Sequence, residues 1–251
     1  MSRLGDVNQF ITASRAARSA DDLRALMEPI TSDMGFDCYA LFQHVKHFSW
    51  RQKKLLAISN YPRSWLEYFF ENKLSADDPI HLASYRTGVG FAFAQIPALI
   101  EITDRQRRIM EESKRAGLTD GFCVPAHIPG ETNGTCTFAM RNGAELPTEN
   151  LSMAQLVGSF AYEAARQLLM RGQKLVRAPA PDALTTRQLE CIILVGKGKT
   201  DWEIARVLGI KEDTVSEHLD EARRRCGVSR RAELPVHALY RGDLSFGDMI
   251  N

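Results

Sequence analysis

The sequence lacks long apolar runs and paired cysteines. Nowhere do eighteen apolar residues stand together, and no apolar segment of the signal-peptide type opens the chain. The five cysteines are an odd set without paired spacing, so neither a disulfide framework nor a zinc site is indicated. They are Cys38, Cys123, Cys136, Cys191 and Cys226. We therefore expect a soluble protein of the reducing cytoplasm, without a membrane partner.

The sequence also lacks an excess of charge of either sign and the motifs of common enzymes. The 32 lysines and arginines balance 31 acids to a net charge of +1, which excludes a globally basic surface. No phosphate-binding glycine loop, metal-ligand spacing or nucleophile elbow occurs, because Gly88-Val89-Gly90 lacks a third glycine and a strand–helix context. We expect neither an enzyme nor a metal or cofactor site.

What the sequence does contain is clearest in its last quarter, where two short amphipathic helices are predicted around Gly209. The apolar residues of the first recur at helical spacing, and those of the second repeat that spacing. They are Ile204, Ala205 and Leu208, followed by Val215, Leu219 and Ala222. Glu212 and Asp213 suit the start of the second helix, since carboxylates stabilise a helix N-terminus. This pattern is typical of a helix-turn-helix, although many all-helical proteins also contain such a pair.

The residues of this region are more specific than its pattern. Conspicuous positions are Leu184, Thr185, Arg187, Glu190, Gly198, Lys199, Thr200, Glu203-Ile204-Ala205, Leu208, Ile210, Thr214-Val215, His218, Gly227-Val228 and Arg230. With these, the stretch from Leu184 to Arg231 resembles the carboxy-terminal DNA-binding domain of the quorum-sensing LuxR family. The resemblance implies double-stranded promoter DNA as a partner and a recognition helix over about 212–226.

The outward positions of that recognition helix carry two acids. Ser216, Glu217 and Asp220 would reach base edges, and a carboxylate can accept a hydrogen bond from a cytosine amino group. Glu217 or Asp220 is therefore a candidate reader of cytosine, and Ser216 a candidate contact to a base or phosphate. Alternatively, the acids pair with Arg223 or Arg224 in the same helix.

Other residues of the region are expected to hold the DNA backbone. The candidate phosphate contacts are Lys199, Thr200, Trp202, Arg223, Arg224 and Arg230, and Thr214 belongs to the DNA-contacting set. By resemblance, Glu190 is internal to this domain and pairs with Arg223 or Arg230 rather than touching DNA.

A proline-bearing segment divides the chain. Residues 173–182 include Pro179 and Pro181, which bar a helix and leave a stiff connector between a domain over 1–172 and one over 183–251. Upstream, hydrophobic spacing and turn signals predict helices over 21–34, 61–72, 103–116 and 151–170, and strands over 38–48, 53–59, 121–128 and 135–140. We expect an α+β fold, an α/β/α sandwich with a central antiparallel sheet, followed by a small all-α helix-turn-helix domain.

The resemblance to the LuxR family extends into the first domain. Asn60-Tyr61-Pro62 is followed by Trp65, Phe69 and Asp78-Pro79, as in the pocket segment of acyl-homoserine lactone receptors. Further matches are Ala116-Gly117-Leu118, Gly121, Pro125 and Gly134. The resemblance implies an autoinducer-binding domain. Its ligand is an uncharged amide with a lactone at one end and an apolar tail at the other, which suits a mostly apolar cavity with a few polar groups.

Asp78 is the leading candidate for contact with such a ligand. An ionised carboxylate only accepts hydrogen bonds, so it can receive the amide N–H of the ligand. Tyr61 and Trp65 lie four residues apart, and the resemblance assigns them to the acyl and lactone carbonyls. The alternatives are a helix start at Asp77-Asp78-Pro79 and simple core packing of the aromatics. Both roles of Asp78 can hold together, since a capping aspartate can also face a cavity.

The remaining pocket candidates leave the identity of the ligand open. Thr137 stands where the family often carries a hydroxyl residue, although threonine also suits any strand. Ile80, Leu118 and Cys123 are candidates for apolar lining. Two residues depart from the family: Phe69 stands where tyrosine is common, and Phe93 where tryptophan is usual. Each departure removes a donor and keeps an aromatic wall, so the ligand can carry an acyl or an aroyl group, or differ from a homoserine lactone.

Together these features predict a ligand-responsive transcription regulator of quorum sensing. A single helix pair buries little surface, so we expect a homodimer on two half-sites, with RNA polymerase as a further candidate partner. The helices over 151–170 and 231–240 offer apolar faces for pairing, although core packing competes for the first. One alternative is a LuxR-type regulator that senses another small molecule. Another is a two-component response regulator, whose ordered acids and parallel receiver sheet the sequence does not show.

Overall fold

The computed structural model describes residues 3–44, 56–128, 131–172 and 183–250, and these fall into two compact units. Residues 1–127 and 132–175 form the first unit, and residues 128–131 and 176–251 form the second. The predicted connector 173–182 lies outside the described residues, as do residues 45–55, which include the end of the predicted strand 38–48 and the start of the predicted strand 53–59. In the described part of the chain, no helix has both the length and the apolar character needed to cross a membrane.

The first unit is built on a five-stranded sheet in the order β2-β1-β5-β4-β3. The strands are β1 (Cys38–Gln43), β2 (Ala57–Ser59), β3 (Phe91–Ala92), β4 (Leu118–Ala126) and β5 (Gly134–Arg141). Every described pair is antiparallel, as predicted. In the central strands Thr137 of β5 lies between Ala40 of β1 and Cys123 of β4. The sequence did not predict the short edge strand β3.

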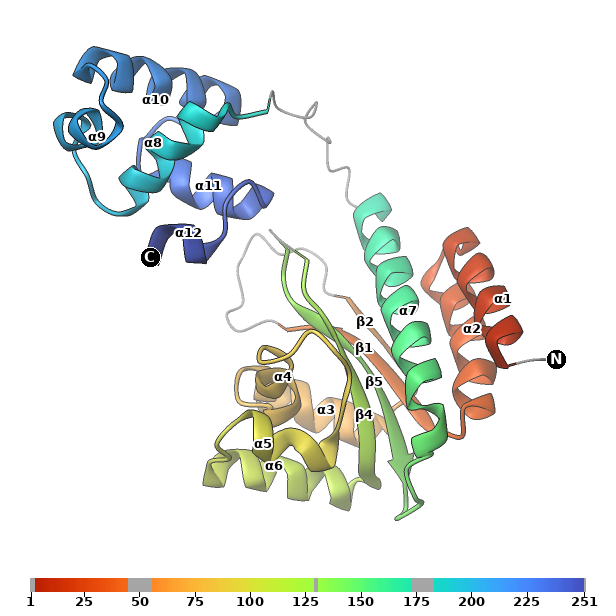
Figure 1. The fold of residues 1–251 in the computed structure, drawn as a ribbon. Coiled ribbons are helices and arrows are strands. Elements are labelled where there is room, and N and C mark those ends of the chain that lie inside the picture. The colour runs from red at the N-terminus through yellow and green to blue at the C-terminus, as the bar shows by residue number, and fades with distance from the viewer. Residues whose placement is uncertain (1–2, 45–55, 129–130, 173–182, 251) are drawn as a thin grey trace. The chain divides into compact units, whose positions relative to one another are not determined.

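Helices cover both faces of this sheet, which confirms the predicted sandwich. One face carries α1 (Arg3–Ala16), α2 (Ala20–Asp33) and α7 (Leu151–Gly172), and the other carries α3 (Arg63–Glu71), α4 (Pro79–Ser84), α5 (Ile96–Leu99) and α6 (Asp104–Arg115) (Figure 1). Three short 3₁₀ turns, Leu74–Ala76, Phe93–Gln95 and Thr148–Asn150, connect these elements. Helices α1 and α5 were absent from the prediction, and α4 had been raised only as the alternative of a helix start at Asp77-Asp78-Pro79.

The alternation of side chains along the strands separates two apolar regions. Phe138 and Met140 of β5 point into the large core under α1, α2 and α7, together with Val157 of α7. Thr137 and Ala139, one residue out of step, point to the opposite face. On α7 the predicted apolar stripe is therefore mainly core, with Val157 and Ala164 buried in it, while Leu156 remains exposed.

Helix α6 begins and ends where its sequence signals predict. The Thr103 hydroxyl accepts a hydrogen bond from the Gln106 N–H, and the Gln106 side chain accepts from the Thr103 N–H in return. Gly117 follows with a φ of 94°, a conformation that only glycine adopts at little cost. Helix α3 begins at Arg63, two residues later than predicted, because Pro62 is the N-cap residue before the first turn and not part of that turn.

The second unit is wholly helical in its described part. It contains α8 (Thr186–Gly196), α9 (Asp201–Leu208), α10 (Glu212–Cys226), α11 (Glu233–Arg241) and α12 (Phe246–Ile250). The predicted apolar positions form its core, which includes Ile192, Ile204, Val215, Leu219 and Leu234. Gly209 ends α9 with a φ of 67°, and α10 begins at Glu212 after two intervening residues. The helix-turn-helix prediction is thus confirmed. The last predicted helix begins at 233 instead of 231, and α12 was not foreseen.

Candidate functional site

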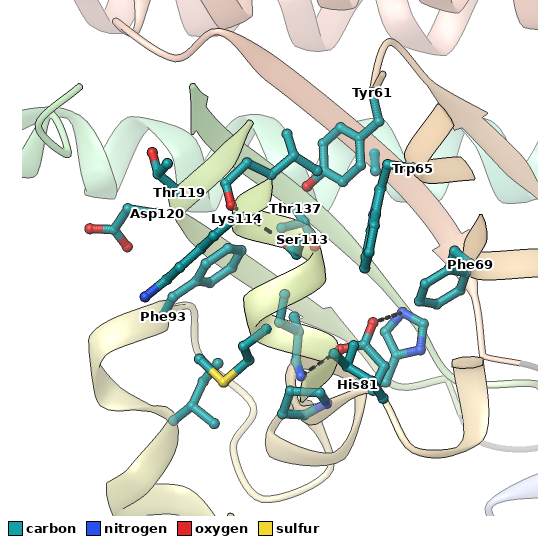
Figure 2. A pocket seen from close by; sticks show the side chains of 18 of the residues that line it. Tyr61, Trp65, Phe69, His81, Phe93, Ser113, Lys114, Thr119, Asp120 and Thr137 are labelled. Atoms are coloured by element: carbon teal, nitrogen blue, oxygen red, sulfur yellow. Dashed lines mark hydrogen bonds and ion pairs between the residues drawn. The ribbon is translucent and has the colours of Figure 1, made fainter. Parts of the chain in front are cut away.

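The first unit encloses a cavity of about 260 Å³ between the sheet and the helices α3 to α6. Figure 2 shows its side chains converging from all of these elements. The lining comprises Ala40, Phe42, Tyr61, Trp65, Phe69, Asp78, Pro79, Ile80, His81, Phe93, Ala94, Ile96, Ile109, Met110, Ser113, Lys114, Leu118, Thr119, Asp120 and Thr137. Most of these residues are apolar or aromatic, and a few polar side chains stand among them.

Eight of the nine candidate pocket residues from the sequence line this one cavity, although they span 61 to 137 in the chain. They are Tyr61, Trp65, Phe69, Asp78, Ile80, Phe93, Leu118 and Thr137. The exception is Cys123, for which the prediction was wrong. Its side chain is on the cavity face of β4 but is fully buried among Ala83, Phe91 and Ile96, in an apolar cluster that borders the cavity.

The carboxylate of Asp78 lies at the buried end of the cavity. Its side chain is 10% exposed, and its Oδ1 accepts a hydrogen bond from the Ile80 N–H at 2.8 Å, which caps α4. Pro79 occupies the first helical position, where its missing N–H costs nothing. The turn interpretation and the cavity interpretation of Asp78 are thus compatible, because one oxygen caps the helix while the same carboxylate lines the cavity.

Two buried histidines that the sequence analysis missed stand beside Asp78. His81 Nε2 is 3.6 Å from Asp78 Oδ2, and the His81 ring stacks on the ring of His44 at a centroid distance of 3.8 Å. Both histidines are less than 5% exposed. The only signal in the sequence was the spacing of Asp78 and His81, three residues apart, which places them on one face of a helix.

Aromatic side chains form the wall next to Asp78. The rings of Trp65 and Phe69 lie 5.8 Å apart between centroids, and Phe42 stacks on Phe69 at 6.4 Å. Tyr61 lines the same wall. The sequence had suggested that Tyr61 and Trp65 share a helix, but α3 begins only at Arg63, so Tyr61 lies before it. Burial raises the pKa of the Tyr61 hydroxyl well above 10, so this group stays protonated and can donate a hydrogen bond.

The opposite end of the cavity is polar and partly open to solvent. Lys114 at the end of α6 is exposed, and Thr119 and Asp120 are half-buried at the start of β4. Figure 2 shows these three away from His81 and Phe69. The register shift between Leu118 and Asp120 is an irregularity of the sheet at this point. The sequence analysis missed this group, because an irregularity of a sheet is not marked by residue type alone.

In the second unit, α10 presents the side chains proposed to meet DNA. Glu217 is exposed, whereas Ser216 is half-buried and its hydroxyl donates to Asp201 Oδ2 at 3.0 Å. Asp220 pairs with Arg223, which is the alternative that the sequence left open for it. Arg231 also pairs with Asp201, at 2.8 Å, so Asp201 connects α9 to α10 and to the segment before α11.

The residues expected to contact phosphates differ in the contacts that their side chains already make within the protein. Thr200 caps α9 in a reciprocal box with Glu203, and Lys199 Nζ is 3.3 Å from Glu203 Oε1. The negative charge at the N-terminus of α9 is therefore the carboxylate of Glu203. Trp202 is 54% exposed, with the guanidinium of Arg206 stacked over its ring at 4.9 Å.

The three arginines and Thr214 complete this set. Arg224 is exposed and pairs with Glu221, Arg230 is exposed, and Arg223 and Thr214 are half-buried. One expectation for the domain interior was wrong. Glu190 is half-buried and pairs with Arg187 at 2.8 Å, one turn earlier in α8, and not with Arg223 or Arg230.

A cavity-bearing α/β/α unit and a helix-turn-helix unit in one chain define a ligand-responsive DNA-binding regulator. Comparison with known proteins gives the family. Residues 19–165 match the profile of the family described as "Autoinducer binding domain", and residues 182–238 match that of "Bacterial regulatory proteins, luxR family". The chain belongs to the LuxR family of quorum-sensing transcriptional regulators.

Individual relatives agree over nearly the whole chain. The transcriptional activator protein AhyR of Aeromonas hydrophila is 28% identical, with 94% of this chain and 91% of AhyR covered. The quorum sensing-dependent regulator RpaR of Rhodopseudomonas palustris is 27% identical over 89% of this chain and 88% of RpaR. The solved structure of SdiA in complex with octanoyl-rac-glycerol shares the fold, with a TM-score of 0.58, 19% identity and 96% of each chain covered.

These findings also bear on the response-regulator alternative. A receiver domain needs a parallel sheet, whereas all described strands of the first unit pair antiparallel and most of this unit matches the autoinducer-binding profile. Within the described residues, no three His, Cys, Asp or Glu side chains are grouped to hold a metal ion.

Proposed function

We propose that the cavity binds an N-acyl- or aroyl-homoserine lactone and that this ligand controls the binding of promoter DNA by α10. Residues 1–172 act as the ligand-binding domain and residues 183–251 as the DNA-binding domain, in the bacterial cytoplasm. The observation that carries the proposal is a buried carboxylate, that of Asp78, lining an aromatic-walled cavity. A neutral ligand with one N–H donor and a largely apolar body suits such a site.

The head group of the ligand would lie at the buried end. The Asp78 carboxylate accepts the amide N–H, the Tyr61 hydroxyl donates to the acyl carbonyl, and the Trp65 indole N–H donates to the lactone carbonyl. Support comes from the shared cavity of these three side chains and from the protonated state of Tyr61. Thr137 on β5 is a further hydrogen-bonding group for the amide. Each contact made away from water is worth more than an exposed one.

The acyl group would point to the open end between Phe93, Met110 and Lys114. A volume of about 260 Å³ lies just below the range of ~300–1,000 Å³ that is common for ligand pockets. We therefore expect a compact acyl group, such as a short chain or a single aromatic ring. The phenyl side chains of Phe69 and Phe93, where relatives often carry donors, suit apolar contact with such a group.

On the DNA side, a homodimer would place one α10 in each of two successive major grooves. Glu217 is the candidate for reading a cytosine, because it is exposed and no ion pair engages it among the described residues. The exposed Arg224 and Arg230 and the half-buried Arg223 would contact phosphates, together with Lys199, Thr200, Trp202 and Thr214. Ser216 would contribute to orientation through Asp201.

The test of ligand binding is the thermal stability of the full chain with a panel of butanoyl-, hexanoyl-, octanoyl-, benzoyl- and cinnamoyl-homoserine lactone. Ligand that binds only the folded state raises Tm. We expect at least one lactone to raise Tm, and Asp78→Asn to weaken its binding at least tenfold, since a hydrogen bond to a charged group is lost. Asp77→Asn is the matched control, because Asp77 is 41% exposed and pairs with Arg105.

The outcomes separate the alternatives. No Tm shift with any lactone, but a shift with octanoyl-rac-glycerol, would favour a receptor for another small molecule. A shift with acetyl phosphate alone would favour a response regulator. Equal losses in Asp78→Asn and Asp77→Asn would contradict the role of Asp78.

A further inference from the structure

We propose that His81 is a positioning residue that aims the Asp78 carboxylate at the N–H of the ligand, and that the stacked ring of His44 holds His81 in place. This inference rests on the proposed function and deepens it. It assigns the selection of an amide-bearing ligand to a trio of buried side chains: His44, which follows β1, Asp78, which caps α4, and His81 within α4.

The first step is the fixed orientation of the carboxylate. Asp78 Oδ1 accepts from the Ile80 N–H at 2.8 Å, and Oδ2 faces His81 Nε2 at 3.6 Å. Each oxygen therefore has one neighbour within the protein that opposes rotation of the carboxylate. An ionised carboxylate offers about four acceptor positions, so these two contacts leave acceptor capacity for a ligand.

The second step is the direction of the His81 proton. His81 Nδ1 lies 3.2 Å from the Ser75 carbonyl oxygen and 3.4 Å from the Ser75 hydroxyl. An imidazolium donates from Nδ1 to the carbonyl and from Nε2 towards Asp78. A neutral ring with its proton on Nε2 accepts at Nδ1 from the Ser75 hydroxyl and still points Nε2–H at Asp78. The tautomer protonated only on Nδ1 donates to the Ser75 carbonyl but sets Nε2 and Asp78 Oδ2 face to face as two acceptors. The imidazolium, which donates at both nitrogens, is the form that satisfies both contacts at once, and it presents a donor to the carboxylate.

The third step is the immobilisation of the His81 ring. His44 stacks on it at 3.8 Å with an interplanar angle of 20°, and Phe69 meets it edge-on at 5.8 Å. His44 is itself held by Tyr85, whose hydroxyl is 3.2 Å from Nδ1, and by Thr135, whose hydroxyl is 3.2 Å from Nε2. Burial and the nearby Asp78 raise the pKa of Tyr85, so its hydroxyl keeps its proton. Because Nδ1 of His81 and both ring nitrogens of His44 have hydrogen-bond partners, neither ring can turn without losing a hydrogen bond.

The consequence is specificity for a donor on the ligand. A carboxylate that cannot turn away discriminates strongly between an N–H and an oxygen at the same position, because an oxygen there would meet it as a second acceptor. If His81 is removed, Oδ2 is free to reorient, and the discrimination falls. The expected signature is thus a coupling between residue 81 and a single atom of the ligand.

The experiment compares the most stabilising lactone of the panel with its ester isostere, in which oxygen replaces the amide N–H. The full chain is used as wild type, His81→Leu, which removes the donor, and His81→Gln, whose amide can still donate. We expect wild type to bind the amide at least tenfold more tightly than the ester, His81→Leu to reduce this ratio at least threefold, and His81→Gln to restore it.

His127→Gln is the matched control, because the His127 Nε2 lies 2.7 Å from the Ser84 carbonyl oxygen at the end of α4 and does not line the cavity. It should leave the ratio unchanged. If His81→Leu does not fold, the more flexible and likewise donorless His81→Met carries the same comparison. Equal weakening of amide and ester in the leucine or methionine variant would show a merely structural His81 and overturn the proposal. A wild type that binds no lactone overturns the proposed function itself, a different result from intact binding without coupling.

Discussion

The two units place their functional polar groups in opposite surroundings. In the first, Asp78 and His81 are buried, have fixed partners within the protein, and stand among aromatic rings. In the second, Glu217 and Arg224 project from α10 into solvent, and the charges pair mainly with neighbours on the same helix. One unit thus offers a few desolvated contacts, and the other offers many screened ones.

This difference follows from what each unit would recognise. A small neutral ligand provides few hydrogen-bonding atoms, so each contact must be strong and directional, which requires burial. DNA provides a repeating line of charges, so exposed cations of small individual value suffice, and their effect depends on salt. In the first unit, substitutions should therefore change the packing of side chains and the orientation of hydrogen bonds. In the second unit, each substitution of an exposed cation should change DNA affinity by a small, additive amount.

The largest loss of stability is expected at Gly134 in β5, where the surrounding atoms leave no room for a side chain. A Cβ added at Gly134 would lie 2.1 Å from the Tyr162 hydroxyl and 2.5 Å from the Phe42 carbonyl oxygen. Gly134→Ala should lower the free energy of unfolding of the first unit by about 3 kcal/mol, as overpacking does at sites that cannot relax. Chemical denaturation measures this. Gly88→Ala, with no atom within 4 Å of the new Cβ, is the control, and an equal loss there would contradict the packing argument.

A smaller effect is expected at the start of α8 in the second unit. The Thr185 hydroxyl accepts from the Gln188 N–H, and the Gln188 side chain accepts from the Thr185 N–H at 2.9 Å. Thr185→Ala should destabilise the second unit by about 1 kcal/mol, the usual value of an N-cap. The neighbouring Thr186→Ala removes an exposed hydroxyl at the next position and should change stability little. Denaturant titration that gives equal values for the two variants would exclude a capping role.

A third effect should appear in the salt dependence of DNA binding. Arg224→Gln removes an exposed cation from α10, so the slope of log affinity against log salt for a random-sequence duplex should fall by about 0.9, the value of one phosphate contact. Arg187→Gln is a matched control, since Arg187 is also exposed and pairs with a glutamate, but lies on α8. Fluorescence anisotropy at several salt concentrations gives the slopes. Unchanged slopes in Arg224→Gln would place this arginine away from the DNA.

The smallest effect concerns acid stability in the first unit. Hydrogen bonds from Arg166 hold the pKa of Glu163 below 4.5. A carboxyl with a depressed folded-state pKa contributes stability above its unfolded-state value and loses it as pH falls through the folded-state value. Glu163→Gln should therefore lower Tm at neutral pH and flatten its decline below about pH 4.5. The exposed Glu111→Gln serves as the control, and an identical acid profile for both variants would refute the assignment.

Sequence reasoning succeeded where a local signal exists. The boundaries of α6 follow from Thr103 and Gly117, and the turn before α10 follows from Gly209. It failed where the signal is short or shared. Helices α4 and α5 are only six and four residues long, which is too few for a helical period to stand out. Glu190 was misassigned because spacing in the chain does not say which of several arginines folds next to a glutamate.

Local patterns in the sequence predict the order of α2, α3, α6, α7 and the longer strands, the helix-turn-helix, and the polar character of position 78, because capping residues, glycines and hydrophobic spacing act within a few residues of one another. Which side chains share the cavity depends instead on how these elements pack. Cys123 and Thr137 are paired neighbours on one face of the sheet, yet only Thr137 lines the cavity. His44 stands 37 positions before His81 in the chain, yet the two rings stack. Contacts of that kind depend on the packing of distant segments, which no local pattern encodes.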